Sequence, residues 1–148
     1  MPESQPLVSF RRVPSGLDRR VIEAFAVRLR KRVAGGREFH CLITGDAELQ
    51  RLNQRFLRKK YPTDVLSFPA GPGARDLGEL AISSQRAREQ AREFGHDIAD
   101  EIRILMLHGV LHLTGMDHAR DGGAMATAEL AWRKTFRLPA GLIERAGA

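Results

Sequence analysis

The chain has 148 residues and a net charge of +6, and its composition, 43% hydrophobic and 28% charged, is typical of one globular domain. No apolar run approaches the roughly eighteen residues of a membrane-spanning helix, and the N-terminus lacks the pattern of a secretory signal. We therefore expect a single domain over residues 1–148, with its core at about residues 7–136, in the cytoplasm and without a membrane partner.

The first half of the chain alternates strand-like and helix-like segments. The predicted elements are, in order, a strand at 7–10, a helix at 17–33, a strand at 38–44, a helix that Asp46 caps and that carries apolar residues between 49 and 57, and a strand at 65–68. Pro62 separates the last two, because proline cannot continue a helix. The single cysteine, Cys41, falls in the second strand, and we expect it to be a buried core residue.

The second half is predominantly helical. After a loop rich in glycine and proline, the predicted elements are a strand at 77–82, a helix that Ser83 or Ser84 caps and that ends at 94, a helix at 98–113 that Asp97 caps, a helix at 122–136, and a tail from Pro139 onward. The residues before this run include a hairpin-like pair of strands. The order predicts an α/β fold: a single domain with one mixed β-sheet of about four strands packed against about five helices.

Three of the five histidines lie close together, in the stretch LHGVLHLTGMDH. His108 and His112 are four residues apart on an otherwise apolar helix, so both imidazoles lie on one helix face, about 6 Å apart along its axis. Gly115 can end that helix and turn the chain, so that His118 faces the pair. A single buried histidine more often bonds to a carbonyl group, but three at this spacing favour a metal site.

Zinc is the metal that this set of ligands favours. Three neutral imidazoles suit zinc and leave a fourth position for water, which is typical of a catalytic site; nickel or another borderline ion is the alternative. The spacing H-x-x-x-H-x-x-G-x-x-H is also that of metzincin proteases. Gly109, however, occupies the position of the glutamate that serves those proteases as general base. We expect Gly109 instead to let another element pack closely.

Two motifs resemble the YbeY family of metal-dependent endoribonucleases, which mature ribosomal RNA. They are HGxLHLxGxDH, matched at residues 108–118, and PTDVLSFP, present at residues 62–69. The likeness covers about residues 52–118. It implies an α/β fold, one Zn2+ held by His108, His112 and His118 in a basic cleft, and single-stranded RNA as substrate. The implied partners are ribosomal RNA or ribosomal subunits, and DNA is not expected; the oligomeric state is not predicted.

A basic cluster precedes the second of these motifs in the sequence and contains no acidic residue: Arg51, Arg55, Arg58, Lys59 and Lys60. Solvated helix faces and phosphate contact are equal alternatives for it. The resembled family usually carries a functionally important arginine at the position of Leu57. We predict that Arg58 supplies this cation, and that Lys59 and Lys60 bind substrate phosphates.

Two aspartates complete the predicted site. Asp64 is a candidate for orienting water or a hydroxyl group, and a turn residue bonded to nearby amides is the alternative. Asp117 is a candidate for holding a ligand imidazole from behind. The leading function is a zinc-dependent, single-strand-specific endoribonuclease. The alternatives are a non-catalytic zinc-containing ribosome assembly or RNA-binding factor, which Leu57 favours, and a metzincin-like metalloprotease, which Gly109 disfavours.

Overall fold

A four-stranded mixed sheet forms the centre of the computed structural model, which describes residues 6–57, 63–117 and 120–146. The strands are β1 (Val8–Phe10), β2 (Phe39–Thr44), β3 (Val65–Pro69) and β4 (Gly78–Ser83). Their order in the sheet is β1-β2-β4-β3. The first three of that order are parallel, and β3 pairs with β4 in antiparallel fashion at the edge. The expected hairpin-like pair is therefore confirmed.

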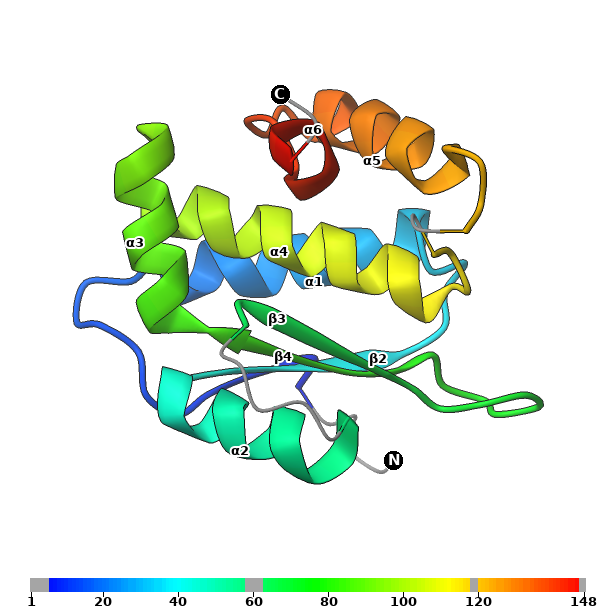
Figure 1. Ribbon diagram of the computed structural model, residues 1–148, viewed down its shortest axis with the longest axis horizontal. Coiled ribbons are helices and arrows are strands. Elements are labelled where there is room, and N and C mark those ends of the chain that lie inside the picture. The colour runs from blue at the N-terminus through cyan, green and yellow to red at the C-terminus, as the bar shows by residue number, and fades with distance from the viewer. Residues whose placement is uncertain (1–5, 58–62, 118–119, 147–148) are drawn as a thin grey trace.

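The helices form layers on both faces of this sheet (Figure 1). They are α1 (Arg19–Arg32), α2 (Asp46–Leu57), α3 (Ser84–Phe94), α4 (Ile98–Leu113), α5 (Ala124–Thr135) and α6 (Leu142–Ala146). Helices α1 and α4 cover one face, α2 covers the other, and α5 and α6 lie on the outer side of α4. The predicted α/β fold with one mixed sheet is confirmed.

The strand β4 joins two hydrophobic clusters, because its side chains alternate between the faces of the sheet. Leu80 and Ile82 belong to the large cluster that includes the apolar residues of α1 and α4. Ala81 points the other way and packs with Leu49 of α2. Cys41 of β2 is fully buried, as expected, and its burial raises the pKa of the thiol far above its ordinary range.

Side-chain caps fix the helices that bear on the site. Ser83 accepts a hydrogen bond from the backbone N–H of Arg86, and Asp97 accepts one from that of Asp100, as predicted for the starts of α3 and α4. The prediction for Asp46 was wrong. This aspartate is the first residue of α2 rather than its cap, and its carboxylate pairs with Arg86 at 2.9 Å.

The predicted tail after Pro139 was also wrong, because α6 follows it. This helix has only five residues, and Leu142 and Ile143 pack against the main hydrophobic cluster.

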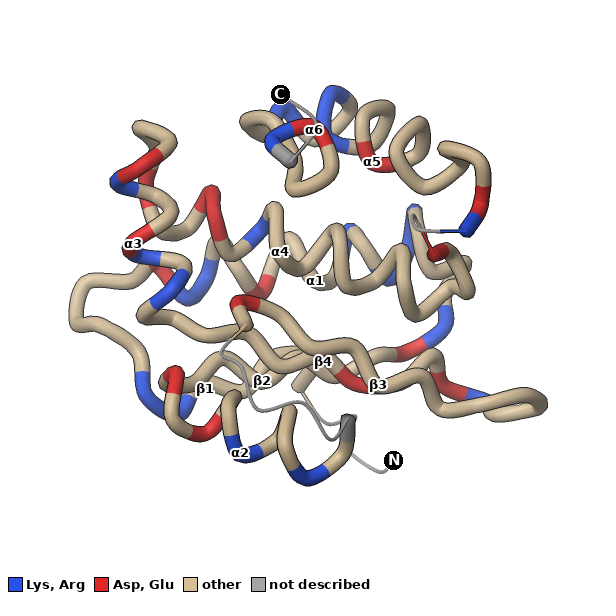
Figure 2. Tube along the Cα trace, viewed as in Figure 1, with Lys and Arg blue, Asp and Glu red and all other residues tan. Residues whose placement is uncertain are grey.

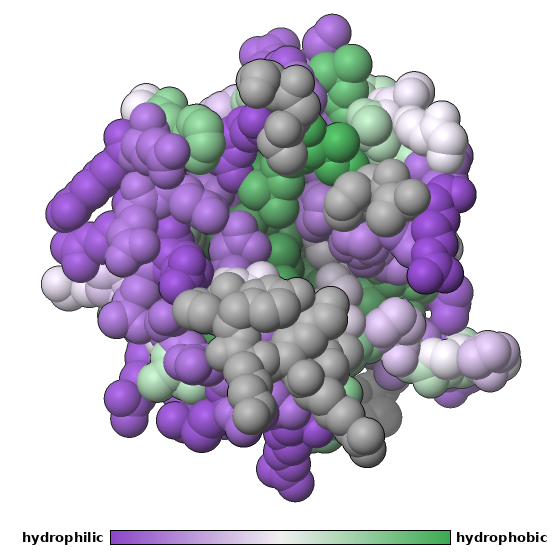
Figure 3. All heavy atoms as spheres, in the orientation of Figure 1, coloured by the Kyte–Doolittle hydropathy of each residue, from purple (hydrophilic) through white to green (hydrophobic). Residues whose placement is uncertain are grey.

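None of the described helices has the length and apolar character that a membrane crossing would require. Hydrophilic residues cover most of the face seen in Figure 3, with a band of apolar residues at its centre.

Candidate functional site

The two histidines of α4 lie side by side. Their ring centroids are 4.8 Å apart and the rings are inclined at 72°. His108 is buried and His112 is half-buried. Both belong to a helix whose other residues in this half are mostly buried. The spacing of four residues therefore brings the imidazoles together as predicted.

Each imidazole is oriented by a hydrogen bond at Nδ1. His108 Nδ1 lies 2.7 Å from Oε2 of Glu129, and His112 Nδ1 lies 3.0 Å from the carbonyl oxygen of Met116. A carbonyl oxygen can only accept, so His112 donates from Nδ1, which leaves Nε2 as the nitrogen that can face a metal. The carboxylate of Glu129 faces Nδ1 of His108 and likewise leaves its Nε2 as the nitrogen that can face a metal. Donation from one ring nitrogen to an acceptor is the arrangement that metal-ligating histidines adopt, so both residues fit a metal.

A glycine turn ends α4 immediately after His112. Gly115 has a φ of 104°, a left-handed conformation that favours glycine, and its N–H donates to the carbonyl oxygen of His112 at 2.9 Å. The turn brings Met116 and Asp117 back toward the two histidines. The predicted reversal of the chain is confirmed up to this point. His118, the predicted third ligand, lies outside the described residues and remains a prediction.

The two histidines line a hollow of about 530 Å³, here called the histidine hollow. Its other lining residues come from α2, from β3 and a residue two positions before it, and from the turn after α4, and include Asn53, Thr63, Ser67 and Asp117. Among the residues that the structure describes, no three histidine, cysteine or acidic side chains are grouped as a complete metal site. The structure therefore locates two of the three predicted ligands, and the metal site itself remains a prediction.

Gly109 is explained by the contact between α4 and the sheet. A Cβ atom on this residue would lie 2.6 Å from Cδ2 of Leu80, which is 1% exposed and cannot swing into solvent. The carbonyl oxygen of Gly109 also accepts a hydrogen bond from Ser67 at 3.4 Å. The expectation that this glycine lets another element pack closely is confirmed, and that element is β4.

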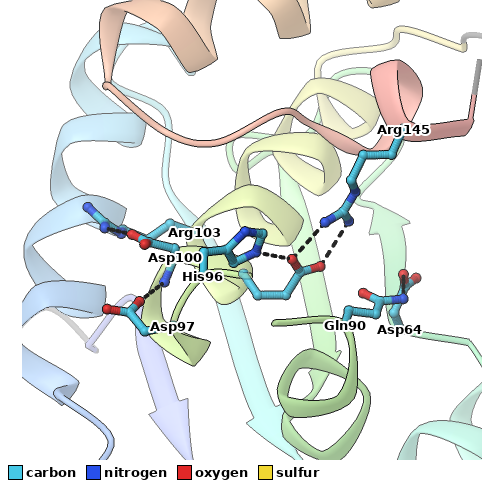
Figure 4. Close-up of polar contacts among 8 residues, drawn as sticks. Asp64, Gln90, His96, Asp97, Asp100, Arg103 and Arg145 are labelled. Atoms are coloured by element: carbon cyan, nitrogen blue, oxygen red, sulfur yellow. Dashed lines mark hydrogen bonds and ion pairs between the residues drawn. The ribbon is translucent and has the colours of Figure 1, made fainter. Parts of the chain in front are cut away.

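The predicted acidic residues occupy different surroundings. The carboxylate of Asp64 accepts a hydrogen bond from Gln90 of α3 at 3.0 Å (Figure 4), and Asp64 is not among the residues that line the histidine hollow. Asp117 does line it. The predicted roles of both residues remain predictions. Arg58, Lys59 and Lys60 lie outside the described residues.

The sequence analysis missed Glu129, whose side chain is 1% exposed. Its second oxygen accepts the backbone N–H of Ile143 at 2.9 Å, so this carboxylate joins a histidine of α4 to the start of α6. A signal was present in the sequence. Glu129 lies four residues after Met125 and seven before Phe136, both buried, and therefore on the apolar stripe of α5.

A second buried carboxylate fixes the other end of α4. Glu101 is fully buried and lies 2.7 Å from Nε2 of His96 and 2.8 Å from Nη1 of Arg145. Figure 4 labels these two partners, His96 and Arg145. A further bond of 2.9 Å makes the contact with Arg145 bidentate. Helix α6 is thus bonded to the start of α4 through Arg145 and Glu101. Through Glu129 it is also linked to His108, in the second half of α4.

Comparisons with known proteins point to one family over most of the chain. A family model described as Endoribonuclease YbeY matches residues 14–132, a range that includes His108, His112 and Glu129. A protein of Solibacter usitatus (strain Ellin6076) named Endoribonuclease YbeY is 63% identical over 139 residues, covering 93% of this chain and 92% of its own. One of the same name from Koribacter versatilis (strain Ellin345) is 46% identical over 131 residues, covering 88% and 86%. The solution structure of TM1509 from Thermotoga maritima matches with a TM-score of 0.58 and 25% identity, covering 87% of this chain and 92% of that one.

Proposed function

Because the chain belongs to the Endoribonuclease YbeY family, we propose that it is a metal-dependent endoribonuclease that cuts single-stranded RNA during ribosomal RNA maturation. The observation that carries the proposal is the pair of imidazoles, His108 and His112, which line one hollow and whose Nδ1 atoms both face acceptors. The family name supports the endoribonuclease activity. The ribosomal substrate is proposed from the resemblance of the two sequence motifs.

We propose that one zinc ion is held by His108, His112 and His118, with nickel as the alternative. When bound, zinc would supply positive charge for phosphate oxygens and lower the pKa of water. The chain's own groups orient the ligands. Glu129 and the carbonyl group of Met116 each face Nδ1 of one imidazole of α4, which leaves Nε2 as the nitrogen that can face a metal.

Substrate binding would need further positive charge, because a phosphodiester is anionic and its transition state gathers more charge on the non-bridging oxygens. We propose that Arg58, Lys59 and Lys60 supply it. They follow α2 in the chain, and Asn53 of that helix lines the histidine hollow. Asp117, which also lines the hollow, is proposed to support a ligand imidazole, and Asp64 to orient water or a hydroxyl group.

A second candidate function is a non-catalytic, zinc-containing factor in ribosome assembly. It is favoured by Leu57, which occupies the position where the family usually carries an arginine. A protease function is disfavoured by the packing at Gly109. Any side chain there would meet Leu80, so the general-base glutamate of the metzincins could not be accommodated without a shift of β4 or of α4.

The test uses the purified, zinc-loaded chain with single-stranded RNA, double-stranded RNA and DNA of one sequence. We expect cleavage of the single-stranded RNA alone. His112→Ala should lose most of the metal and the cleavage, because two imidazoles bind an ion far more weakly than three. His40→Ala is the matched control, since that histidine bonds to Ser9 Oγ at 2.9 Å and does not line the histidine hollow.

Two results would overturn the proposal. Cleavage by His112→Ala at the wild-type rate would mean that the metal site has no part in the reaction. A wild-type protein that holds zinc, binds RNA and cuts none of it would favour the assembly factor instead. Elemental analysis of the same samples provides the metal content independently of activity.

A further inference from the structure

A second hollow lies at the edge of the sheet where the three parallel strands end. It has a volume of about 590 Å³ and is formed by the residues after β1 and by the first turns of α2 and α3. Four of its lining residues are arginines: Arg11, Arg12, Arg51 and Arg88. We call it the arginine hollow. Figure 2 shows the basic positions that follow β1 beside the start of α2.

Most of this positive charge is not neutralised by the protein. Arg11 pairs with Glu48 at 2.6 Å, and Glu48 also accepts a hydrogen bond from Thr44. Throughout the described part of the chain, no acidic side chain forms an ion pair with the other three arginines. Cations that converge on a concave surface repel one another and concentrate the field there, so the hollow favours an anion.

Hydrogen bonds hold the walls of the arginine hollow together. Buried Ser84 donates from Oγ to the carbonyl oxygen of Arg12 at 2.7 Å, which ties the residues after β1 to the start of α3. Gln85 accepts the backbone N–H of Asp46 at 2.7 Å, which ties α3 to α2. The first turn of α3 contains no acidic residue, so its amide groups add to the positive potential of the arginines.

The location suits a ligand of the same chemistry as the proposed substrate. Ligands of open α/β sheets bind beyond the carboxyl ends of the strands, where successive helices pass to opposite faces, as α1 and α2 do here. Helix α2 contributes to both hollows, with Arg51 in the arginine hollow and Asn53 in the histidine hollow. A polyanion that extends past α2 would therefore meet both.

We propose that the arginine hollow binds phosphate groups of the RNA strand, at nucleotides to one side of the bond that is cut. This inference rests on the proposed function and adds a second contact that makes affinity depend on RNA length. Arginine suits the contact because it can offer two parallel donors to one phosphate.

The test compares two charge-matched double variants. Arg12→Gln with Arg88→Gln removes two cations from the arginine hollow. Lys31→Gln with Arg92→Gln removes two exposed cations from the last turns of α1 and α3, outside the residues that line either hollow. Both variants lower the net charge equally, so a difference between them reports position rather than charge.

Binding is measured by fluorescence anisotropy with single-stranded RNA of about four and about sixteen nucleotides, the limits of typical single-strand site sizes. In the arginine variant, the ratio of affinities for the longer and shorter RNA should fall, and KM for the longer RNA should rise. The slope of log K against log salt should become shallower by about 1.4, since each lost phosphate contact changes it by about 0.7. The control should keep the wild-type ratio and slope.

Equal slopes and length ratios for the two variants would overturn the inference, because only net charge would then matter. An equal loss for short and long RNA would also overturn it, because the contribution of the arginine hollow would then not depend on RNA length. A wild-type protein that cleaves neither RNA would overturn the proposed function, while the binding comparison would still decide the role of the arginine hollow. Thermal unfolding of both variants checks that the fold is intact.

Discussion

Glu129→Gln replaces a buried carboxylate with an amide of the same shape. In the wild-type protein the two carboxylate oxygens face two donors, His108 Nδ1 at 2.7 Å and the backbone N–H of Ile143 at 2.9 Å. A glutamine has one oxygen that accepts and one NH2 group that donates. It can therefore satisfy only one of the two donors. Water cannot serve as acceptor for the other donor, because residue 129 is only 1% exposed.

Either orientation of the amide has a measurable consequence. If its oxygen faces Ile143, the NH2 group faces His108 and shifts the imidazole proton to Nε2, the nitrogen that the metal needs. If its oxygen faces His108, the part-buried Ile143 N–H faces the NH2 group and loses its acceptor, which costs up to about 1–3 kcal/mol of unfolding free energy. In both cases the imidazole loses its anionic partner, so we expect zinc affinity to fall about 10–100-fold.

Zinc affinity is measured by competition with a chromophoric chelator, and stability by urea unfolding of the metal-free protein. Glu144→Gln is the control, because it makes the same change of charge on α6 at a partly exposed carboxylate. The role assigned to this carboxylate would be refuted if Glu129→Gln were fully folded and bound zinc as tightly as the wild-type protein. Equal losses of affinity in both variants would mean that net charge, rather than the contact with His108, is responsible.

Gly109→Ala should lower the unfolding free energy in urea by up to about 2 kcal/mol, because overpacking against a buried leucine costs more than the gain in helix propensity; a more stable variant would contradict the close contact. The hydrogen bonds from Arg133 hold the pKa of Glu144 below its ordinary value of 4.5, so their contribution is present above that pH and is lost as acid protonates the carboxylate. Glu144→Gln should therefore reduce the acid sensitivity of unfolding, by less than about 1 kcal/mol because the pair is partly exposed; an unchanged pH profile would argue against it. Arg58→Ala should lower RNA cleavage much more than Arg55→Ala with zinc content unchanged, and equal rates for Arg58→Ala and wild type would place the required cation elsewhere.

Local signals were sufficient to predict the framework of the fold. The starts of α3 and α4 follow from Ser83 and Asp97, whose side chains bond to amides three residues ahead in the chain. The reversal after α4 follows from Gly115 for the same reason, since a left-handed residue acts on its immediate neighbours. Such interactions span a few residues, so sequence spacing alone describes them.

Helix α6 could not be predicted in this way. Five residues are too few for a helix to be stable by itself in water, and its residues carry no strong local signal. Its position depends on partners that are distant in the chain. Arg145 bonds to Glu101, 44 residues earlier, and Ile143 bonds to Glu129, 14 residues earlier. The predicted tail was wrong because these contacts exist only in the folded protein.

The same distant contacts orient the proposed metal ligands, which the sequence motif alone does not do. The spacing of His108 and His112 predicts which side chains converge, but not which nitrogen each ring presents. For His108 that choice is made by Glu129, and Glu129 in turn is bonded to the start of α6. A carboxylate is suited to this position because its two oxygens accept from an imidazole and an amide at once, which neither an amide nor an apolar side chain can do. The C-terminal helix is therefore a structural part of the candidate site, even though none of its residues lines the histidine hollow.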